Sequence, residues 1–251
     1  MNISFRRFGR PRGGVRLLGA AALGIGALVA AAPGIAHAAA PTVVTYVMNA
    51  NWGSGFQADV TITPGTGVTS WSLEFDAGDQ QQITLAAYAG ATQAGRHVTL
   101  TNRSFNGTIA AGASENLVVQ FTNPTLTDAP PPAFTFNGVP AAYTPQPYLQ
   151  TTDAQPIVPE GGSATVGLTL SQAPTSTVTV RVGSGSSAAV VAAPQSLTFT
   201  AADWNVPHPI TLTSPRDTDT TNETSWISLE QWGGSPTYTY DFILATELHN
   251  G

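Results

Sequence analysis

The side chains best suited to acid–base or metal chemistry are few and scattered in this sequence. Beyond residue 38 the chain has three histidines, His97, His208 and His249, and they stand far apart. There is no His-x-x-x-His pair of the kind that binds zinc, and no Gly-x-Ser-x-Gly turn for a nucleophile. A glycosidase would also need two carboxylates placed across a cleft. The residue types and spacings therefore predict a protein that is not an enzyme.

Aromatic side chains form the second chemically useful group. Trp52 stands in a Gly-rich turn, residues 51–55, outside any alternating run, so we expect its ring on the surface. Trp71 alternates with other apolar residues, and we expect it in the core. For Phe105 we favour a surface position, with inward packing as the alternative. For Tyr88 the sequence favours neither a surface position nor inward packing. An exposed ring beside amides suits binding by stacking and hydrogen bonding.

The first 38 residues have the pattern of a cleaved signal peptide. A basic segment with five arginines, residues 6–16, precedes an apolar stretch, residues 17–32, and Ala36-His37-Ala38 supplies the small residues of a cleavage site. A retained N-terminal anchor is the alternative. Cleavage would leave Ala39 first, so a copper site built on an N-terminal histidine is not expected. The pattern predicts an extracellular, secreted protein.

The charge balance excludes whole classes of partner. The sequence has nine arginines, no lysine and fifteen acidic residues; removal of the five leader arginines leaves 4 − 15 = −11. Such an acidic chain does not neutralise a phosphate backbone or an anionic membrane surface, so we expect neither nucleic acid nor membrane as partner of the mature form. Neutral polymers carry no such penalty. There is no cysteine, so the fold relies on packing alone, and we expect a monomer.

Period-two alternation of apolar and polar residues dominates the chain, while helical periodicity is hard to find. Turns containing Gly, Asn or Pro separate the alternating runs at roughly ten-residue intervals, which is typical of antiparallel sandwiches. We predict an all-β protein with two antiparallel β-sandwich domains in tandem. The predicted strands cover residues 43–47, 58–63, 71–75, 117–121, 134–138, 164–170, 177–182, 196–199, 209–213, 224–229 and 237–246.

These strands divide the mature chain into two domains of similar length. The first is expected at residues 40–143 and the second at residues 149–247, with a short Pro-containing linker at residues 144–148 between them. Processing leaves 251 − 38 = 213 residues, and the two sandwiches use them all. A catalytic barrel of about 250 residues has no room beside them.

Three stretches of the first domain resemble family 2 carbohydrate-binding modules. They are Asn51–Ala58, Trp71–Phe75 and Asn102–Ile109, and they occur in the order and at the spacing of that family. The resemblance covers residues 40–143 and implies a sandwich that holds insoluble polysaccharide on a row of aromatic rings. The apolar face of a pyranose ring stacks on such rings, while neighbouring polar groups bond its hydroxyls.

The resemblance also implies which residues contact the glycan. Trp52 matches the first aromatic position, and Phe105 stands where the family usually has Trp. The middle position falls at about Ala87, which cannot stack, but a shift of one residue would bring Tyr88 onto the face. The expected hydroxyl partners are amides, for which a role as ordinary turn formers is the alternative: Asn51, Gln57, Asn102 and Asn106.

The second domain, residues 149–247, is similar to Calx-β and related immunoglobulin-like modules. The similarity lies in the Val158–Ser163 stretch, the Leu197–Asn205 corner and the acidic segment that begins at Asp217. It implies acidic loops that bind calcium, and carboxylates are the oxygen ligands that calcium prefers. The candidate ligands are Glu160, Asp217, Asp219 and Glu223. Calcium is the only cofactor to be expected.

Together, these features predict a secreted, non-catalytic polysaccharide-binding protein. The expected ligand is an insoluble β-glycan, with cellulose favoured and chitin or xylan as alternatives. Two other hypotheses remain open. The chain is a structural or adhesive extracellular protein with a calcium-stabilised second domain, or it is the remnant of a glycoside hydrolase that has lost its catalytic domain.

Overall fold

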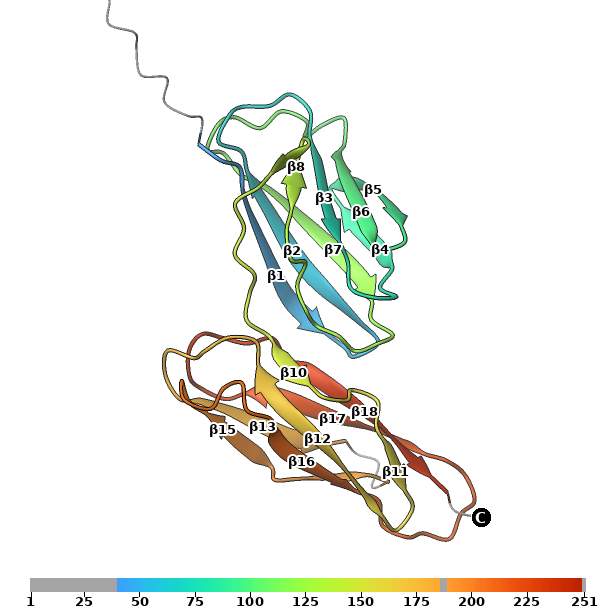
Figure 1. Cartoon of the computed structure of the whole chain (residues 1–251). Coiled ribbons are helices and arrows are strands. Elements are labelled where there is room, and N and C mark those ends of the chain that lie inside the picture. The colour runs from blue at the N-terminus through green and yellow to red at the C-terminus, as the bar shows by residue number, and fades with distance from the viewer. Residues whose placement is uncertain (1–39, 186–188, 250–251) are drawn as a thin grey trace, which may run out of the picture. The chain divides into compact units, whose positions relative to one another are not determined.

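A computed structural model describes residues 40–185 and 189–249 of the protein (Figure 1). The predicted signal peptide lies outside the described residues. The described chain consists of β-strands joined by turns and loops, and the predicted all-β fold with tandem sandwiches is confirmed. Within these ranges no helix has the length and apolarity needed to cross a membrane.

The first sandwich consists of two antiparallel sheets. One sheet contains, in spatial order, β1 (Val43–Asn51), β2 (Gly55–Thr63), β7 (Glu115–Thr122) and β4 (Ile83–Ala87). The other contains β5 (Ala89–Ala94), β6 (His97–Asn102), β3 (Ser72–Asp76), β8 (Thr135–Phe136) and β9 (Val139–Pro140). The chain passes from the first sheet to the second between β4 and β5, where Tyr88 alone separates the two strands.

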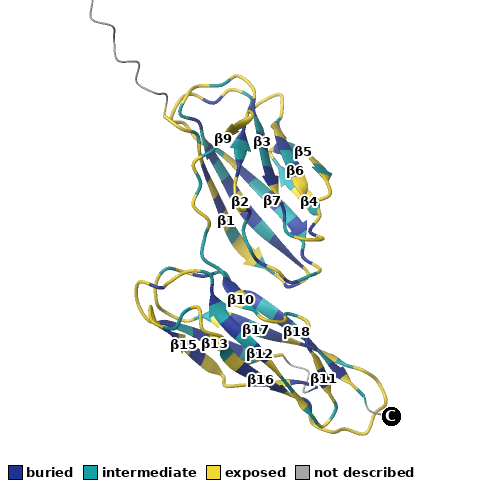
Figure 2. Cartoon of the chain, in the orientation of Figure 1, coloured by how far each residue is buried: buried dark blue, intermediate teal, exposed yellow. Residues whose placement is uncertain are grey.

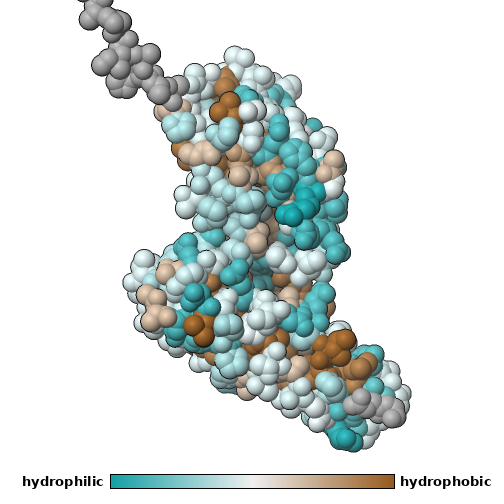
Figure 3. All heavy atoms as spheres, viewed as in Figure 1, coloured by the Kyte–Doolittle hydropathy of each residue, from teal (hydrophilic) through white to brown (hydrophobic). Residues whose placement is uncertain are grey.

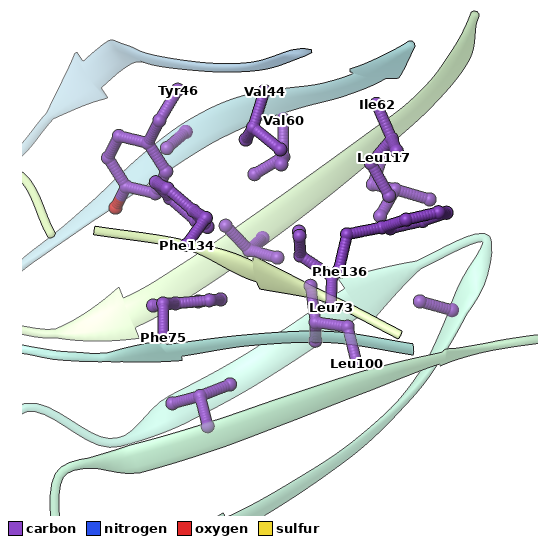
Figure 4. Packing of buried hydrophobic residues seen from close by; sticks show 14 of the residues in the cluster. Val44, Tyr46, Val60, Ile62, Leu73, Phe75, Leu100, Leu117, Phe134 and Phe136 are labelled. Atoms are coloured by element: carbon purple, nitrogen blue, oxygen red, sulfur yellow. The ribbon is translucent and has the colours of Figure 1, made fainter. Parts of the chain in front are cut away.

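The core of the first sandwich follows from the alternation in its strands. In β2, Phe56, Ala58, Val60 and Ile62 are buried while the residues between them face outward (Figure 2). Burial of each large apolar side chain contributes about 1.5–3 kcal/mol to stability. Figure 4 shows the buried side chains of both sheets packed between the strands. The alternation thus determines which face of each strand is exposed and able to contact a ligand.

Aromatic side chains make up much of that core. Phe134 lies 5.1 Å from Phe75 and 6.0 Å from Tyr46, measured between ring centroids. Trp71 is only 3% exposed, as its alternation predicted, and its indole Nε1 donates a hydrogen bond of 2.8 Å to the carbonyl oxygen of Asn106. The buried indole therefore anchors a loop of the surface as well as filling the interior.

The second sandwich has the same plan with different strands. One sheet contains β10 (Leu149–Thr151), β12 (Ser163–Leu170), β16 (His208–Thr213) and β14 (Val191–Ala193). The other contains β11 (Ile157–Pro159), β18 (Asp241–Leu248), β17 (Thr224–Gln231), β13 (Val178–Ser184) and β15 (Ser196–Phe199). Only the β11–β18 pair is parallel among the strand pairs described. The two sheets enclose a separate cluster of buried apolar side chains.

Among the described residues, the strand pattern differs from the predicted one by seven strands that were not predicted (β4, β5, β6, β9, β10, β11 and β14) and by the start of the last strand. β4 is an edge strand with a register irregularity after Ile83, and β5 is mostly Ala, Gly and Thr. The last strand begins at Asp241 rather than at residue 237, because Tyr238 is bound by side chain and backbone to Gln172 and Gln231 in a loop. Tertiary contacts outweigh local propensity in β4, in β5 and at the start of β18.

A buried pair of carboxyl groups joins the two sandwiches, which belong to one compact unit, Ala39–Gly251. Asp128 is 2% exposed and Asp241 is 3% exposed, and their side chains are hydrogen-bonded to each other. Asn123 Nδ2 donates to Asp128 Oδ1 at 2.9 Å. Asn51 Nδ2 donates to the other oxygen of Asp128 and, at 3.0 Å, to the carbonyl oxygen of Tyr240. One polar cluster therefore links loops of both sandwiches.

Two carboxyl groups in hydrogen-bond contact share a proton rather than both ionising. Burial raises the pKa of Asp241 to about 7, and burial together with the charge of Asp241 raises the pKa of Asp128 well above its ordinary value. Two phenols also belong to this neighbourhood, because Tyr46 interacts electrostatically with both Asp128 and Tyr143. Burial raises the pKa of Tyr143 to about 12 and that of Tyr46 further, so neither ionises in the same range.

The carboxyl pair should make stability decrease as pH rises. Unfolded carboxyl groups lose their protons near pH 4, whereas the folded pair keeps a proton to about pH 7 or beyond. The folded state thus binds more protons in that interval, and the free energy of unfolding should fall by up to ~1.4 kcal/mol per pH unit for each proton. Denaturant titrations at a series of pH values from about 4.5 to about 9 measure this slope, because that range covers both the unfolded and the folded pKa values.

The variant Asp241→Asn provides the control for this slope. It removes one carboxyl group while leaving a side-chain oxygen that can still accept from the backbone N–H of Phe242, as Asp241 Oδ1 does at 2.7 Å. We expect its stability to change much less over the same pH interval. Identical slopes for the variant and the wild type would show that the pair does not carry the effect.

Candidate functional site

Trp52 lies in the turn that joins β1 to β2, and its side chain is 47% exposed. Gly53 has φ +81°, a left-handed conformation that glycine adopts without strain. Its N–H donates to Asn51 Oδ1 at 2.8 Å, and Trp52 N–H donates to Gly55 carbonyl at 3.0 Å. The ring lies over Gly55: a Cβ there would be 2.7 Å from the indole Nε1. The Gly-x-Gly spacing therefore holds the indole at the surface.

The ring of Trp52 lies on the outer face of the first sheet. Side chains along a strand alternate between faces, so Gly55 and Gln57 share a face and Phe56 points into the core. Because the indole covers the position of the missing Gly55 side chain, it lies on the same face as Gln57. The prediction of an exposed Trp52 ring is confirmed.

Tyr88 is 58% exposed and occupies the junction between β4 and β5. Its φ of +67° is left-handed, which is uncommon for a bulky side chain and must be held by the surroundings. The carbonyl oxygen of Tyr88 accepts a hydrogen bond of 2.7 Å from Asn106 Nδ2. Ala87, at the position expected from the resemblance, ends β4 without presenting a ring. Tyr88 is the residue that brings an aromatic ring to the surface here.

Phe105 is the most exposed of the three aromatic residues, at 72%. It stands in the turn after β6, where the N–H of Asn106 donates to the carbonyl oxygen of Arg103 at 3.4 Å. The side-chain oxygen of Asn106 also accepts from the N–H of Arg103 at 2.8 Å. The predicted surface position of Phe105 is confirmed, and inward packing is excluded.

The amide of Asn106 holds these elements together and is only 7% exposed. Its oxygen accepts from Arg103, and its nitrogen donates to the Tyr88 carbonyl and, at 2.7 Å, to Glu115 Oε1. The carbonyl of Asn106 accepts from the indole of Trp71. The side chain therefore uses its amide groups within the chain, between the Phe105 turn, the Tyr88 junction and the start of β7.

Two other predicted hydroxyl partners are also engaged within the protein. Asn102 Oδ1 accepts from the N–H of Trp71 at 2.8 Å, and its Nδ2 donates to the carbonyl of Arg103 at 3.0 Å. Asn51 bonds the Gly53 N–H, Asp128 and the Tyr240 carbonyl, as described above. The structure uses both amides to shape the loops that carry the aromatic rings.

Gln57 is different, because it belongs to a row of amides on the outer face of the first sheet. Its Nε2 donates to Asn49 Oδ1 at 3.2 Å, and its Oε1 accepts from Gln120 Nε2 at 2.9 Å. The row crosses β1, β2 and β7. Gln120 and Asn49 were not predicted as site residues; the outward position of Gln120 in the alternating run of β7 is the signal that identifies it.

Strand register shows how the three rings are distributed. Gly55, beneath Trp52, pairs with Thr122 at the end of β7; Ala87, before Tyr88, pairs with Val118; and Asn106, after Phe105, bonds Glu115 at the start. At about 3.4 Å per residue, the seven steps from Glu115 to Thr122 cover about 24 Å. Trp52 thus stands beside one end of β7, while the segments that carry Tyr88 and Phe105 contact its middle and its start.

Three of the four carboxylates predicted as calcium ligands make contacts within the chain, and Glu160 Oε1 accepts from the N–H of Asp217 at 3.3 Å. Asp217 Oδ1 accepts from the N–H of Asp219 at 3.0 Å, and hydrogen bonds from the backbone and side chain of Thr221 lower the pKa of Asp219. Glu160 Oε2 lies 3.0 Å from His249 Nδ1. Among the described residues, no three His, Cys, Asp or Glu side chains are grouped as metal ligands would be.

A known protein family matches the sequence of the first sandwich. Residues 42–141 match the family model described as "Cellulose binding domain". The chain is 42% identical over 92 residues to exoglucanase B of Cellulomonas fimi, which covers 35% of this chain and 8% of that protein. It is 37% identical over 81 residues to chitinase C of Streptomyces lividans, which covers 32% of this chain and 13% of that protein.

Among the solved structures, the chitin-binding domain of Chi18aC from Streptomyces coelicolor is similar to part of this chain. It has 30% sequence identity and a TM-score of 0.34, and the match covers 41% of this chain and 94% of that one. This chain thus matches these two curated relatives over only 13% and 8% of their length. Residues 42–141 are the part of the chain that matches the cellulose-binding family model.

Proposed function

We propose that the protein binds the chains of an insoluble, neutral polysaccharide on the aromatic residues Trp52, Tyr88 and Phe105. The observation that carries this proposal is that three large rings are exposed by 47%, 58% and 72% on turns fixed by hydrogen bonds. Single exposed apolar residues are common on proteins. Each of the three rings offers an apolar face on which a pyranose ring can stack.

The amide row completes the chemistry of this surface. Gln57, Gln120 and Asn49 supply donors and acceptors on the face that Trp52 covers, and sugar hydroxyls require both. We propose Asn51, Asn102 and Asn106 as residues that position the rings rather than contact the ligand. Figure 3 shows polar residues over much of the visible surface of the first sandwich, with apolar atoms in small groups.

Cellulose is the proposed ligand, with chitin and xylan as the other candidates. The match of residues 42–141 to the cellulose-binding family supports binding of this class, and the similar segments of an exoglucanase and a chitinase agree with it. The excess of carboxylates favours a neutral polymer over an acidic one. The leader pattern of residues 1–38 supports an extracellular location, and we propose that the protein binds without catalysing a reaction.

Removal of Trp52 should weaken binding. Burial of a large aromatic face contributes about 1.5–3 kcal/mol, so Trp52→Ala should lower affinity about 10- to 100-fold. Depletion isotherms on microcrystalline cellulose and on chitin measure the effect. The control is Trp232→Ala, which removes an exposed indole of the second sandwich that contacts Arg181. If wild type and Trp52→Ala both stay in the supernatant with both polymers, the proposed function is wrong.

Asn106→Ala should reduce both stability and affinity, although Asn106 itself is buried. The substitution leaves the Tyr88 carbonyl and the Arg103 N–H without their partner, which costs about 1–3 kcal/mol in the free energy of unfolding. The freed Tyr88 and Phe105 would then bind saccharide less well. Denaturant unfolding and the same isotherms measure the two effects. Asn116→Ala, an exposed amide on β7, is the control and should change neither measurement appreciably.

Calcium should not change the stability of the protein. A ligand stabilises the folded state only when that state offers it a site, and the described residues contain no group of three acidic, His or Cys side chains that could hold a metal ion. We expect the same melting temperature in millimolar calcium and in chelator, measured by calorimetry. A clear rise in calcium would restore the hypothesis of a calcium-stabilised second domain.

A further inference from the structure

Aromatic side chains also gather on the outer face of a sheet in the second sandwich. Trp226 on β17 and Tyr240, just before β18, each pack edge-on against Phe242. The centroid distances are 5.6 Å and 4.7 Å, and the interplanar angles are 77° and 79°. Trp226 and Tyr240 are each 37% exposed. Cross-strand register places Phe242 opposite Ser228 and Leu244 opposite Trp226, so these side chains share one face.

This aromatic group adjoins the turn that carries Trp52. A Cβ on Gly53 would lie 2.5 Å from Cζ3 of Trp226, so the turn rests directly on that indole. One residue before Trp52, Asn51 Nδ2 donates to the carbonyl oxygen of Tyr240 at 3.0 Å. Both residues belong to the same compact unit. The group formed by Trp226, Phe242 and Tyr240 is therefore in direct contact with the turn that carries Trp52.

A hollow of about 270 Å³ connects the two surfaces. It is lined by Met48, Asn49, Ala50, Asn51, Thr239 and Tyr240. Asn49 belongs to the amide row of the first sheet, and Tyr240 belongs to the aromatic group of the second sandwich. The hollow therefore has on its walls the two kinds of group that bind a sugar, an amide and an aromatic ring.

We infer that the second sandwich supplies an additional saccharide subsite, in which Tyr240 and Asn49 contact the same neutral glycan chain that the first sandwich binds. This inference rests on the proposed function and extends it across the junction. The occupant is a polysaccharide because the hollow continues the amide row. Glu230, on the strand beside Tyr240, favours sugar hydroxyls as donors and disfavours an acidic polymer.

Two variants test the subsite, one on the side of the second sandwich and one on the side of the first. Tyr240→Ala removes the ring, and Ala50→Gln places a longer neutral side chain into the hollow from an exposed position of β1. We expect each to lower affinity for cellulose or chitin about 3- to 10-fold, the contribution of one aromatic contact. Trp226 is unsuitable for this test because it supports Gly53.

The experiment uses the full mature chain, depletion isotherms on both polymers, and Trp232→Ala as the control that should bind like wild type. Melting temperatures check that each variant is folded. If wild type binds and both Tyr240→Ala and Ala50→Gln bind equally well, the subsite is overturned while the proposed function stands. If wild type itself fails to bind either polymer, the proposed function fails and the subsite fails with it.

Discussion

The arrangement of the candidate site depends on one buried amide. Asn106 joins the Phe105 turn, the Tyr88 junction and the start of β7, and its carbonyl receives the indole N–H of the core residue Trp71. A buried polar group is stable only when its hydrogen bonds are made, so these four segments are held in one relative arrangement. Tyr88 tolerates its left-handed backbone because that arrangement fixes its carbonyl.

The sequence was sufficient to predict the fold class and much of the strand pattern. Apolar residues at every second position of β2, β3 and β7 identify their buried faces directly. The strand β6 was not predicted, although it has the same pattern, with Val98 and Leu100 buried. β4 and β5 were not recognisable from the sequence, because an irregular edge strand and a run of Ala, Gly and Thr gain their order from β7 and β6 rather than from local preference.

The candidate site was predictable in part, for a physical reason. A ring in a glycine-rich turn has no core to enter, so the exposure of Trp52 followed from its neighbours. The partners of an amide depend on atoms distant in the chain: Asn51 bonds residues 77 and 189 positions away. No local pattern reveals that Asn51 and Asn106 are occupied within the protein, or that Gln57 belongs to a row with Gln120. Hydrogen-bond partners are a property of the folded chain.

The contact between Trp52 and Gly55 has a consequence for the thermodynamics of recognition. An indole that already rests on the backbone has little rotational freedom to lose when a ligand arrives. Its association should therefore carry a smaller entropic penalty than that of a ring on a mobile loop. A surface preorganised in this way suits a rigid, repetitive solid whose own chains cannot adapt.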